Sequence, residues 1–156
     1  MSTLKANDIT KVNGDPVLSG RVVTLTQYTS SSYAVGGAAP RVIDSFNFTK
    51  KFSSSISTVF GIFGVNNLQE GSQAQRYTVY RGSSPEVGMY RLRHGNSGWS
   101  MSLDTFTWTD TGAAAGVITY NLRIEEYVTQ FYYNYPTNLS GSPNGLSTFT
   151  IMEILN

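Results

Sequence analysis

The residue types that most often perform catalysis are scarce in this sequence. It contains one histidine, His94, and no cysteine, so a zinc site built from Cys and His ligands and a thiolate nucleophile are both excluded. A Ser-His-Asp triad would have to recruit His94, but the sequence contains no Gly-x-Ser-x-Gly nucleophile motif. We therefore interpret His94 as a turn residue.

The ten carboxylates are scattered along the chain. Glu125 and Glu126 are neighbours, but adjacent side chains of a strand point to opposite faces, so these two cannot form a close acid–base pair. Asp104 and Asp110 flank an aromatic segment, as the acids of a sugar-binding site would, although loop acids are more often turn formers. The glycines of Phe60–Asn67 do not match a phosphate-binding loop. We expect no catalytic, cofactor-binding or metal-binding residue and no enzyme activity.

Basic side chains gather between residues 76 and 94, where Glu86 is the single acid. Two of these arginines, two residues apart, point the same way on a strand, so adjacent strands could build a basic stripe. Such a stripe would suit an acidic partner surface or sulfated or acidic glycans; the alternative is an ordinary solvated sheet face. The candidate anionic-partner residues are Arg76, Arg81, Arg91 and Arg93.

An aromatic cluster occupies Tyr127–Pro136, with the sequence YVTQFYYNYP. A tyrosine combines apolar area with a hydroxyl, which suits subunit interfaces and sugar-binding platforms, and core packing is the third interpretation. The candidate interface residues of this segment are Tyr127, Phe131, Tyr132, Tyr133 and Tyr135.

The last strand, Leu146–Leu155, is apolar on both faces. One set of alternating positions contains Met152 and Ile154, and the other contains Phe149, Ile151 and Leu155. A strand of this type is expected to be covered on both sides. The cover is either a loop of the same chain or a neighbouring subunit, and on the second interpretation Met152, Ile154 and Leu155 are interface residues.

The elements that must position these side chains are strands. Val117–Glu126 alternates apolar and polar residues and predicts a half-buried antiparallel strand. Gly61 and Gly64 predict a bend or bulge in a central strand, and a bulge near Asp104 or Thr105 would explain a change of apolar phase. The other predicted strands are Arg21–Tyr28, Ser45–Phe52, Ile56–Val65, Arg76–Arg81, Gly88–His94, Trp99–Trp108 and Leu146–Leu155.

About eight to ten short strands with Gly/Pro/Ser/Asn turns predict an all-β protein, a single-domain antiparallel β-sandwich or jelly roll. Charged residues are only 13% of the 156 residues and the net charge is +1, so we expect no nucleic-acid partner. Neither a secretory signal nor an apolar run of membrane-spanning length is evident, so we expect no membrane partner. We divide the chain into an amino-terminal segment, 1–20, and a β-sandwich domain, 21–156.

The chain begins MSTLKANDITKVNGDPVLSGRV and contains STFTIMEI near its end. The opening is similar to that of small virion structural proteins of marine tailed phages, cyanophages especially, in which Met-Ser/Ala-Thr-Leu/Ile-Lys-x-Asn-x-Ile precedes a Gly turn and a Val-rich strand. The ending is similar to theirs, in which a Ser-Thr-hydrophobic-Thr stretch runs into Met-Glu-Ile. The likeness covers these thirty residues of 156, and the middle of the chain is unfamiliar.

This resemblance implies a homo-oligomeric jelly-roll decoration, knob or fibre-head subunit of a phage particle, attached to the capsid or tail and made in the host cytoplasm. It implies a homotrimer, contacts with other virion proteins, and an amino-terminal anchor that includes Leu4, Lys5 and Ile9. The alternative is a tail-associated module that binds a host polysaccharide, with sugar rings stacked on Tyr132, Tyr133, Tyr135 or Trp108. A capsule-degrading enzyme is the third hypothesis.

Overall fold

The computed structural model describes residues 20–30, 34–35, 41–70, 74–93, 99–126, 131–133 and 146–156. His94, Tyr127 and Tyr135 and the amino-terminal anchor lie outside these residues. In the described part the chain forms strands and no helix, and so no helix able to cross a membrane. The strands are β1 (Val22–Ser30), β2 (Ala34–Val35), β3 (Arg41–Lys50), β4 (Ser57–Glu70), β5 (Ala74–Arg81), β6 (Glu86–Arg93), β7 (Trp99–Asp110), β8 (Gly116–Glu126), β9 (Phe131–Tyr133) and β10 (Ser147–Leu155).

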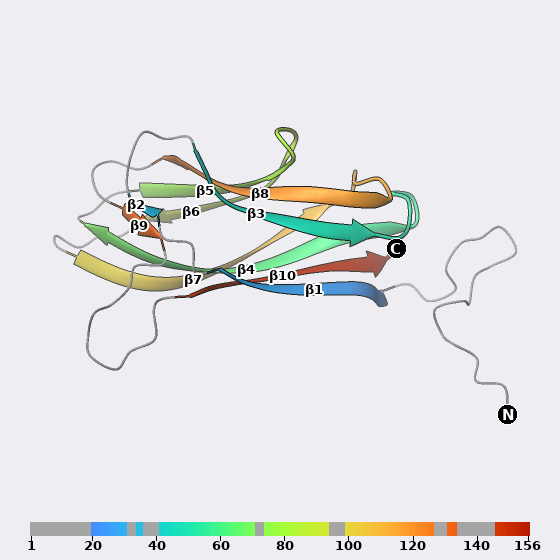
Figure 1. Cartoon of the computed structure of the whole chain (residues 1–156), viewed down its shortest axis with the longest axis horizontal. Helices are drawn as coiled ribbons and strands as arrows, with labels where there is room; N and C mark the ends of the chain where they lie inside the picture. Colours follow the sequence, from blue (N-terminus) through green and yellow to red (C-terminus); the bar gives the residue numbers. More distant parts are fainter. Residues whose placement is uncertain are drawn as a thin grey trace, which may run out of the picture.

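The strands form two antiparallel sheets that pack face to face (Figure 1). One, the β4 sheet, has the order β1-β10-β4-β7. The short β9 pairs with the part of β4 that runs past the end of β10, and β2 pairs with β9. The other, the β8 sheet, has the order β3-β8-β5-β6. The predicted all-β sandwich is therefore confirmed, and β4 is the central strand that its apolar sequence indicated.

The strand pairs are nested. β5 pairs with β6, β4 with β7, β3 with β8 and β1 with β10, so the chain runs out to the turn at residues 82–85 and returns alongside itself. Two further pairings, β10 with β4 and β8 with β5, roll this long hairpin into two sheets. This is a jelly roll, an arrangement found in viral capsid and lectin domains among others.

The alternation of β8 places four apolar side chains in the core, as predicted: Ile118, Tyr120, Leu122 and Ile124. The other seven predicted strands also form, with ends that differ by a few residues. The short β2 and β9 were not predicted, and β9 lies within the tyrosine segment.

Neither predicted bulge forms. β7 keeps one continuous register with β4, so no bulge lies near Asp104 or Thr105. The apolar phase changes because Leu103 points outward, with 64% of its surface exposed, while Phe106 points inward. The β4 register is also continuous through Gly61 and Gly64.

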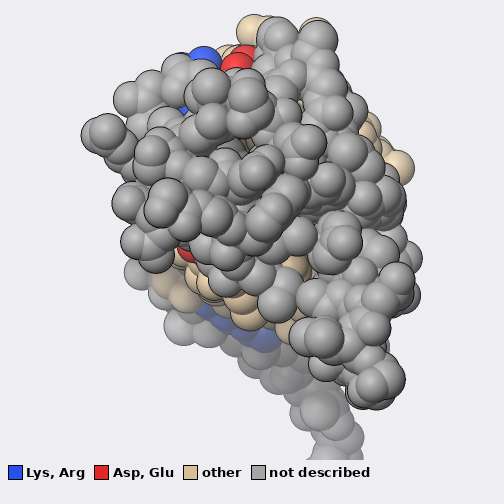
Figure 2. Space-filling model, turned by 90° about the vertical axis from the view of Figure 1, so that its left-hand side faces the viewer, with Lys and Arg blue, Asp and Glu red and all other residues tan. Residues whose placement is uncertain are grey.

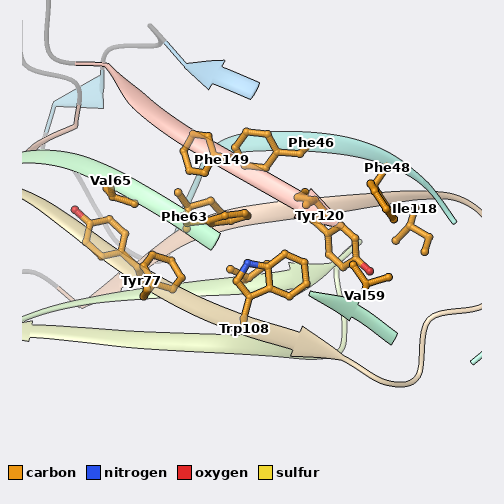
Figure 3. Close-up of a cluster of buried hydrophobic side chains, with 14 of the residues drawn as sticks. Phe46, Phe48, Val59, Phe63, Val65, Tyr77, Trp108, Ile118, Tyr120 and Phe149 are labelled. Carbon is orange, nitrogen blue, oxygen red and sulfur yellow. The ribbon is translucent and has the colours of Figure 1, made fainter. Parts of the chain in front are cut away.

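Gly61 instead makes room for Trp108, which lies at the centre of the core between the sheets (Figure 3). A Cβ at Gly61 would lie 2.1 Å from an indole carbon, and a Cβ at Gly88 would lie 2.3 Å from the Cβ of Trp108. The indole also meets Phe63 edge-on, with ring centroids 5.4 Å apart. Such aromatic pairs contribute about 0.5–1.5 kcal/mol beyond the area that they bury.

Candidate functional site

The outer face of the β4 sheet carries no charge over five rows of side chains, and register places a charged residue, Glu70, only at the far end of β4. Register places five rows of side chains there, because positions two apart along a strand share a face. Threonines and apolar side chains dominate the rows, which run Val22, Ile154, Thr58; Leu25, Met152, Phe60, Thr109; Gln27, Thr150, Ile62, Thr107; Thr29, Thr148, Gly64, Thr105; and Asn66, Leu103.

Strand β10 supplies the middle of this face, and its two apolar sides have different roles. Phe149 and Ile151 point inward and are buried in the core. Met152 points outward, where register sets it between Leu25 of β1 and Phe60 of β4. Because β10 has a strand on each side, its outward side chains are half-buried within a single chain.

The predicted interface residues of β10 thus lie on opposite sides. Met152 and Ile154 belong to the uncharged outer face, whereas Leu155 is only 6% exposed and lies inside the chain. Large apolar side chains remain open to solvent on this face: Leu25 is 54% exposed and Ile62 37%. Exposed apolar patches of this kind mark contact sites more often than isolated apolar side chains do.

The outer face of the β8 sheet differs, because it carries charged side chains, and these contact an opposite charge or an aromatic ring. A nitrogen of Arg76 lies 3.9 Å from Glu125, which also accepts a hydrogen bond from Thr78 at 3.0 Å. The guanidinium of Arg123 lies over the ring of Tyr80, 4.2 Å from its centroid. This face has the character of an ordinary solvated surface.

The four arginines predicted to form a stripe do not act alike. Arg76 faces Glu125, and Arg81 donates a 3.2 Å hydrogen bond to the buried carboxylate of Asp110. Arg91 lies directly across from Arg76 in β6, and Arg93 lies across from Ala74. In the view of Figure 2 the described basic side chains appear at separate places, and those at the top lie beside acidic ones.

The tyrosine segment enters the structure through β9, which pairs with β4 and β2. Tyr133 is fully buried, and its hydroxyl donates a 3.1 Å hydrogen bond to Asp44. Burial is the main cause that raises the pKa of Tyr133. Phe131 and Tyr132 are placed only by their register, opposite Gln69 and Leu68. Tyr133 and Trp108, two of the proposed sugar-stacking residues, are therefore core residues.

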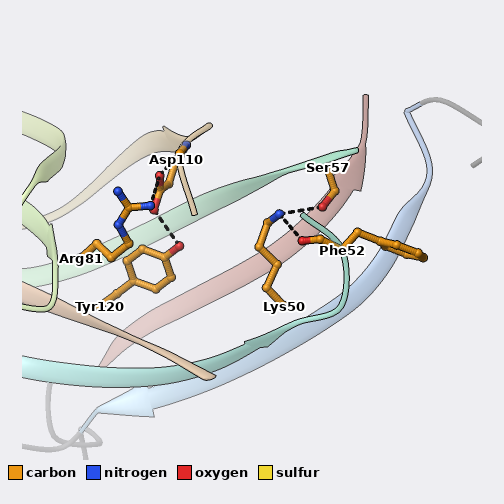
Figure 4. Close-up of polar contacts among 7 residues, drawn as sticks. Lys50, Phe52, Ser57, Arg81, Asp110 and Tyr120 are labelled. Carbon is orange, nitrogen blue, oxygen red and sulfur yellow. Dashed lines mark hydrogen bonds and ion pairs between the residues drawn. The ribbon is translucent and has the colours of Figure 1, made fainter. Parts of the chain in front are cut away.

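A buried polar cluster at the end of β10 was missed by the sequence analysis; Figure 4 shows its Lys50, Phe52 and Ser57. The fully buried Glu153 accepts hydrogen bonds from the backbone N–H groups of Lys51 and Phe52, at 2.8 and 2.9 Å, and from the Ser57 hydroxyl at 2.6 Å. Lys50 donates to Ser57 at 2.8 Å and to the Phe52 carbonyl at 2.6 Å. Glu153 thereby fixes the connection between β3 and β4.

The charges of this cluster are arranged for stability. Burial lowers the pKa of Lys50, and the carboxylates of Glu153 and Asp110 act in the opposite direction. Ser57 is fully buried, so its hydroxyl does not meet solvent-borne molecules. The sequence held one signal of this cluster, since Glu153 occupies the same alternating set as Phe149, Ile151 and Leu155.

A second buried carboxylate, Asp110 at the end of β7, accepts three hydrogen bonds. One oxygen accepts from Arg81 at 3.2 Å and from the backbone N–H of Gly112 at 3.0 Å. The other accepts from the hydroxyl of Tyr120 at 3.1 Å, and burial is the main cause that raises the pKa of that phenol. Across the described part of the chain, no three His, Cys, Asp or Glu side chains come together as a metal site.

No family model and no curated protein matches this chain. Among solved structures, it matches chains of infectious bursal disease virus at 12% identity over 95% of its length: the Gx strain with a TM-score of 0.41, the Gt strain with 0.36, and the VP2 subviral particle with 0.31. The chain spans about half the length of these virus chains, covering 45–47% of each. A likeness at these scores carries no functional argument, and the resemblance to phage virion proteins stays a prediction.

Proposed function

We propose that this protein is a non-enzymatic structural subunit of a virus particle that assembles with copies of itself through the outer face of its β4 sheet. The observation that supports this proposal most is the absence of charge from that face over five rows of described side chains. A solvated sheet face normally carries charges, and the β8 sheet of the same molecule does so.

The chemistry of the face favours a second copy as its occupant. A charged partner surface would lose its hydration there and find no counter-charge, which is unfavourable. Another copy of the same face brings only threonines, amides and apolar side chains, so no charge is buried. Closed symmetric assemblies of identical subunits use such self-complementary surfaces.

The free edge of the β4 sheet supports the same assembly. β1 forms this edge and pairs only with β10 among the described strands. Its sequence, VVTLTQYTS, contains neither charge nor proline, although exposed edge strands are commonly protected by one or the other. A bulge between Val22 and Thr24 leaves the rest of β1 in regular register.

The finer assignment rests on the resemblance of the two chain ends to phage proteins. On that basis the subunit is a decoration, knob or fibre-head protein of a phage particle, a homotrimer held to the capsid or tail by the segment that contains Leu4, Lys5 and Ile9. The jelly roll is compatible with this role, since viral capsid domains are among the proteins that use it.

Charge substitutions test the assembly surface. In sedimentation equilibrium, Leu25→Lys should weaken self-association at least tenfold, because it places an unpaired charge within the contact. Met89→Lys is the matched control: Met89 is 56% exposed on the β8 sheet, and its substitution should leave the association unchanged. A wild-type chain that sediments as a monomer at micromolar concentration, or equal effects of both variants, would contradict the proposal.

The location is tested separately. Gold-labelled antibody against the protein should decorate intact particles from the source lysate, and absence of label from every particle would contradict the virion assignment. Deletion of residues 1–14 should abolish attachment to the particle while the β-sandwich stays folded, as judged by circular dichroism. Attachment that survives the deletion would contradict the anchoring role.

A further inference from the structure

One pocket in the described part of the chain is not explained by a structural subunit. It is an open hollow of about 420 Å³ beside the end of β5 and the start of β8, within the usual size range of small-molecule sites. It lies at the connection between β7 and β8, and none of its lining residues belongs to the rows of the proposed assembly face. Its lining combines small residues, apolar side chains and one cation: Arg81, Gly82, Gly112, Ala114, Ala115, Val117, Ile118 and Thr119.

The guanidinium of Arg81 is held in place at this pocket. Its Nη1 donates to Asp110, which also accepts hydrogen bonds from the Gly112 N–H and the Tyr120 hydroxyl (Figure 4). The backbone of Gly112 lies beside the guanidinium, since a Cβ built there would be in ordinary van der Waals contact with Nη2, at 3.4 Å. The side chain is 26% exposed, and its other N–H groups have no partner among the described residues.

This arrangement selects the chemistry of a ligand. A fixed guanidinium presents its N–H groups as a fork that matches a carboxylate. Asp110 offsets the charge of Arg81, and the lining contains no second cation. Recognition therefore rests on the hydrogen-bonding fork, and a doubly charged phosphate would lack a second counter-charge. The apolar part of the lining includes Val117, which is 73% exposed.

We propose that the pocket beside Arg81 binds the carboxylate of an acidic sugar. The carboxylate lies against the free edge of the guanidinium, and the C–H face of the sugar ring lies on Ala114, Ala115 and Val117. The Thr119 hydroxyl, which donates to Asn47 at 2.8 Å, keeps its lone pairs to accept from a sugar hydroxyl. This site gives the virion subunit a second activity outside its assembly surface.

The test is a titration of the full chain with D-glucuronate, followed by NMR at the backbone amides of Gly82, Gly112 and Gly116, with D-glucose as the neutral control. Glucuronate should bind at least tenfold more tightly than glucose, because only it presents a carboxylate to Arg81. Equal binding of the two sugars, or no saturable shifts with glucuronate, would overturn the proposal.

Two substitutions at exposed positions test the proposal without changing the core. Val117→Asp places a negative charge on the pocket lining at an exposed position and should weaken glucuronate binding at least tenfold. Val42→Asp is the matched control: it makes the same change on the same sheet, at a side chain that is 46% exposed and outside the pocket, and it should leave binding within twofold. Unchanged binding in Val117→Asp would overturn the proposal. Self-association is read in a separate experiment, so either proposal can fail alone.

Discussion

At the scale of single residues, the core depends on the fit of one indole between two backbones. Trp108 occupies space that a side chain at Gly61 or Gly88 would need. Sequence patterns show these glycines but not their partner, since the three residues are far apart in the chain and meet only when β4, β6 and β7 assemble. This is why the sequence suggested a bulge where the structure has a close contact.

Gly61→Ala should therefore lower the free energy of unfolding by about 1–3 kcal/mol, the usual effect of overfilling a packed core. Gly64→Ala is the control within the same strand, because the nearest atom to its Cβ would be the Thr148 hydroxyl, at 3.1 Å, whereas the Cβ at Gly61 would overlap the buried indole. Urea unfolding measures both. A combination of Gly61→Ala with Trp108→Phe should recover part of the loss, and an equal loss in the two single variants would contradict this account.

At the scale of elements, strands are predictable here where one face is apolar and the other polar. The alternation of β8 determined both its bounds and its inward residues. The short β9 was not predictable, because Phe131, Tyr132 and Tyr133 have no polar alternation and their pairing depends on β4 running past the end of β10. Likewise the alternation of β10 is consistent with a Glu153 side chain that points inward, but the groups that donate hydrogen bonds to it lie about a hundred residues away in the chain.

Glu153→Gln should destabilise the connection between β3 and β4. An amide nitrogen would replace an oxygen that accepts hydrogen bonds from buried donors, so we expect a loss of about 1–3 kcal/mol. Glu86→Gln, at an exposed position near the 82–85 turn, should change stability by less than about 0.5 kcal/mol. Both are measured by chemical unfolding, and a similar small effect of the two substitutions would show that the cluster is not a source of stability.

At the scale of the whole molecule, buried phenols link stability to high pH. Burial raises the pKa values of Tyr77, Tyr120 and Tyr133 above 10 in the folded chain. The unfolded chain therefore loses these protons first, so their contribution to stability is complete below pH 10 and is lost as pH rises above it, by about 1.4 kcal/mol per unit for each phenol.

The lowered pKa of Lys50 offsets part of this slope. Unfolding free energies measured between pH 8.5 and 11 should fall above pH 10, and Tyr120→Phe should remove about 1.4 kcal/mol per unit of the decline. A stability that does not change across this range would contradict the burial of these phenols.

The nested pairing also leaves the two outer strands of the long hairpin side by side. β1 begins where β10 ends: the Gly20 N–H donates to the Leu155 carbonyl at 2.7 Å. A short linker could join residue 156 to residue 20, and new termini could be opened in the 82–85 turn, which would give a circularly permuted domain with the same sheets. Peptides fused at those new ends would emerge next to the Arg81 pocket, whereas fusions at residue 156 would emerge beside the start of β1. The native form of the domain and its permuted form thus offer attachment points at two different places.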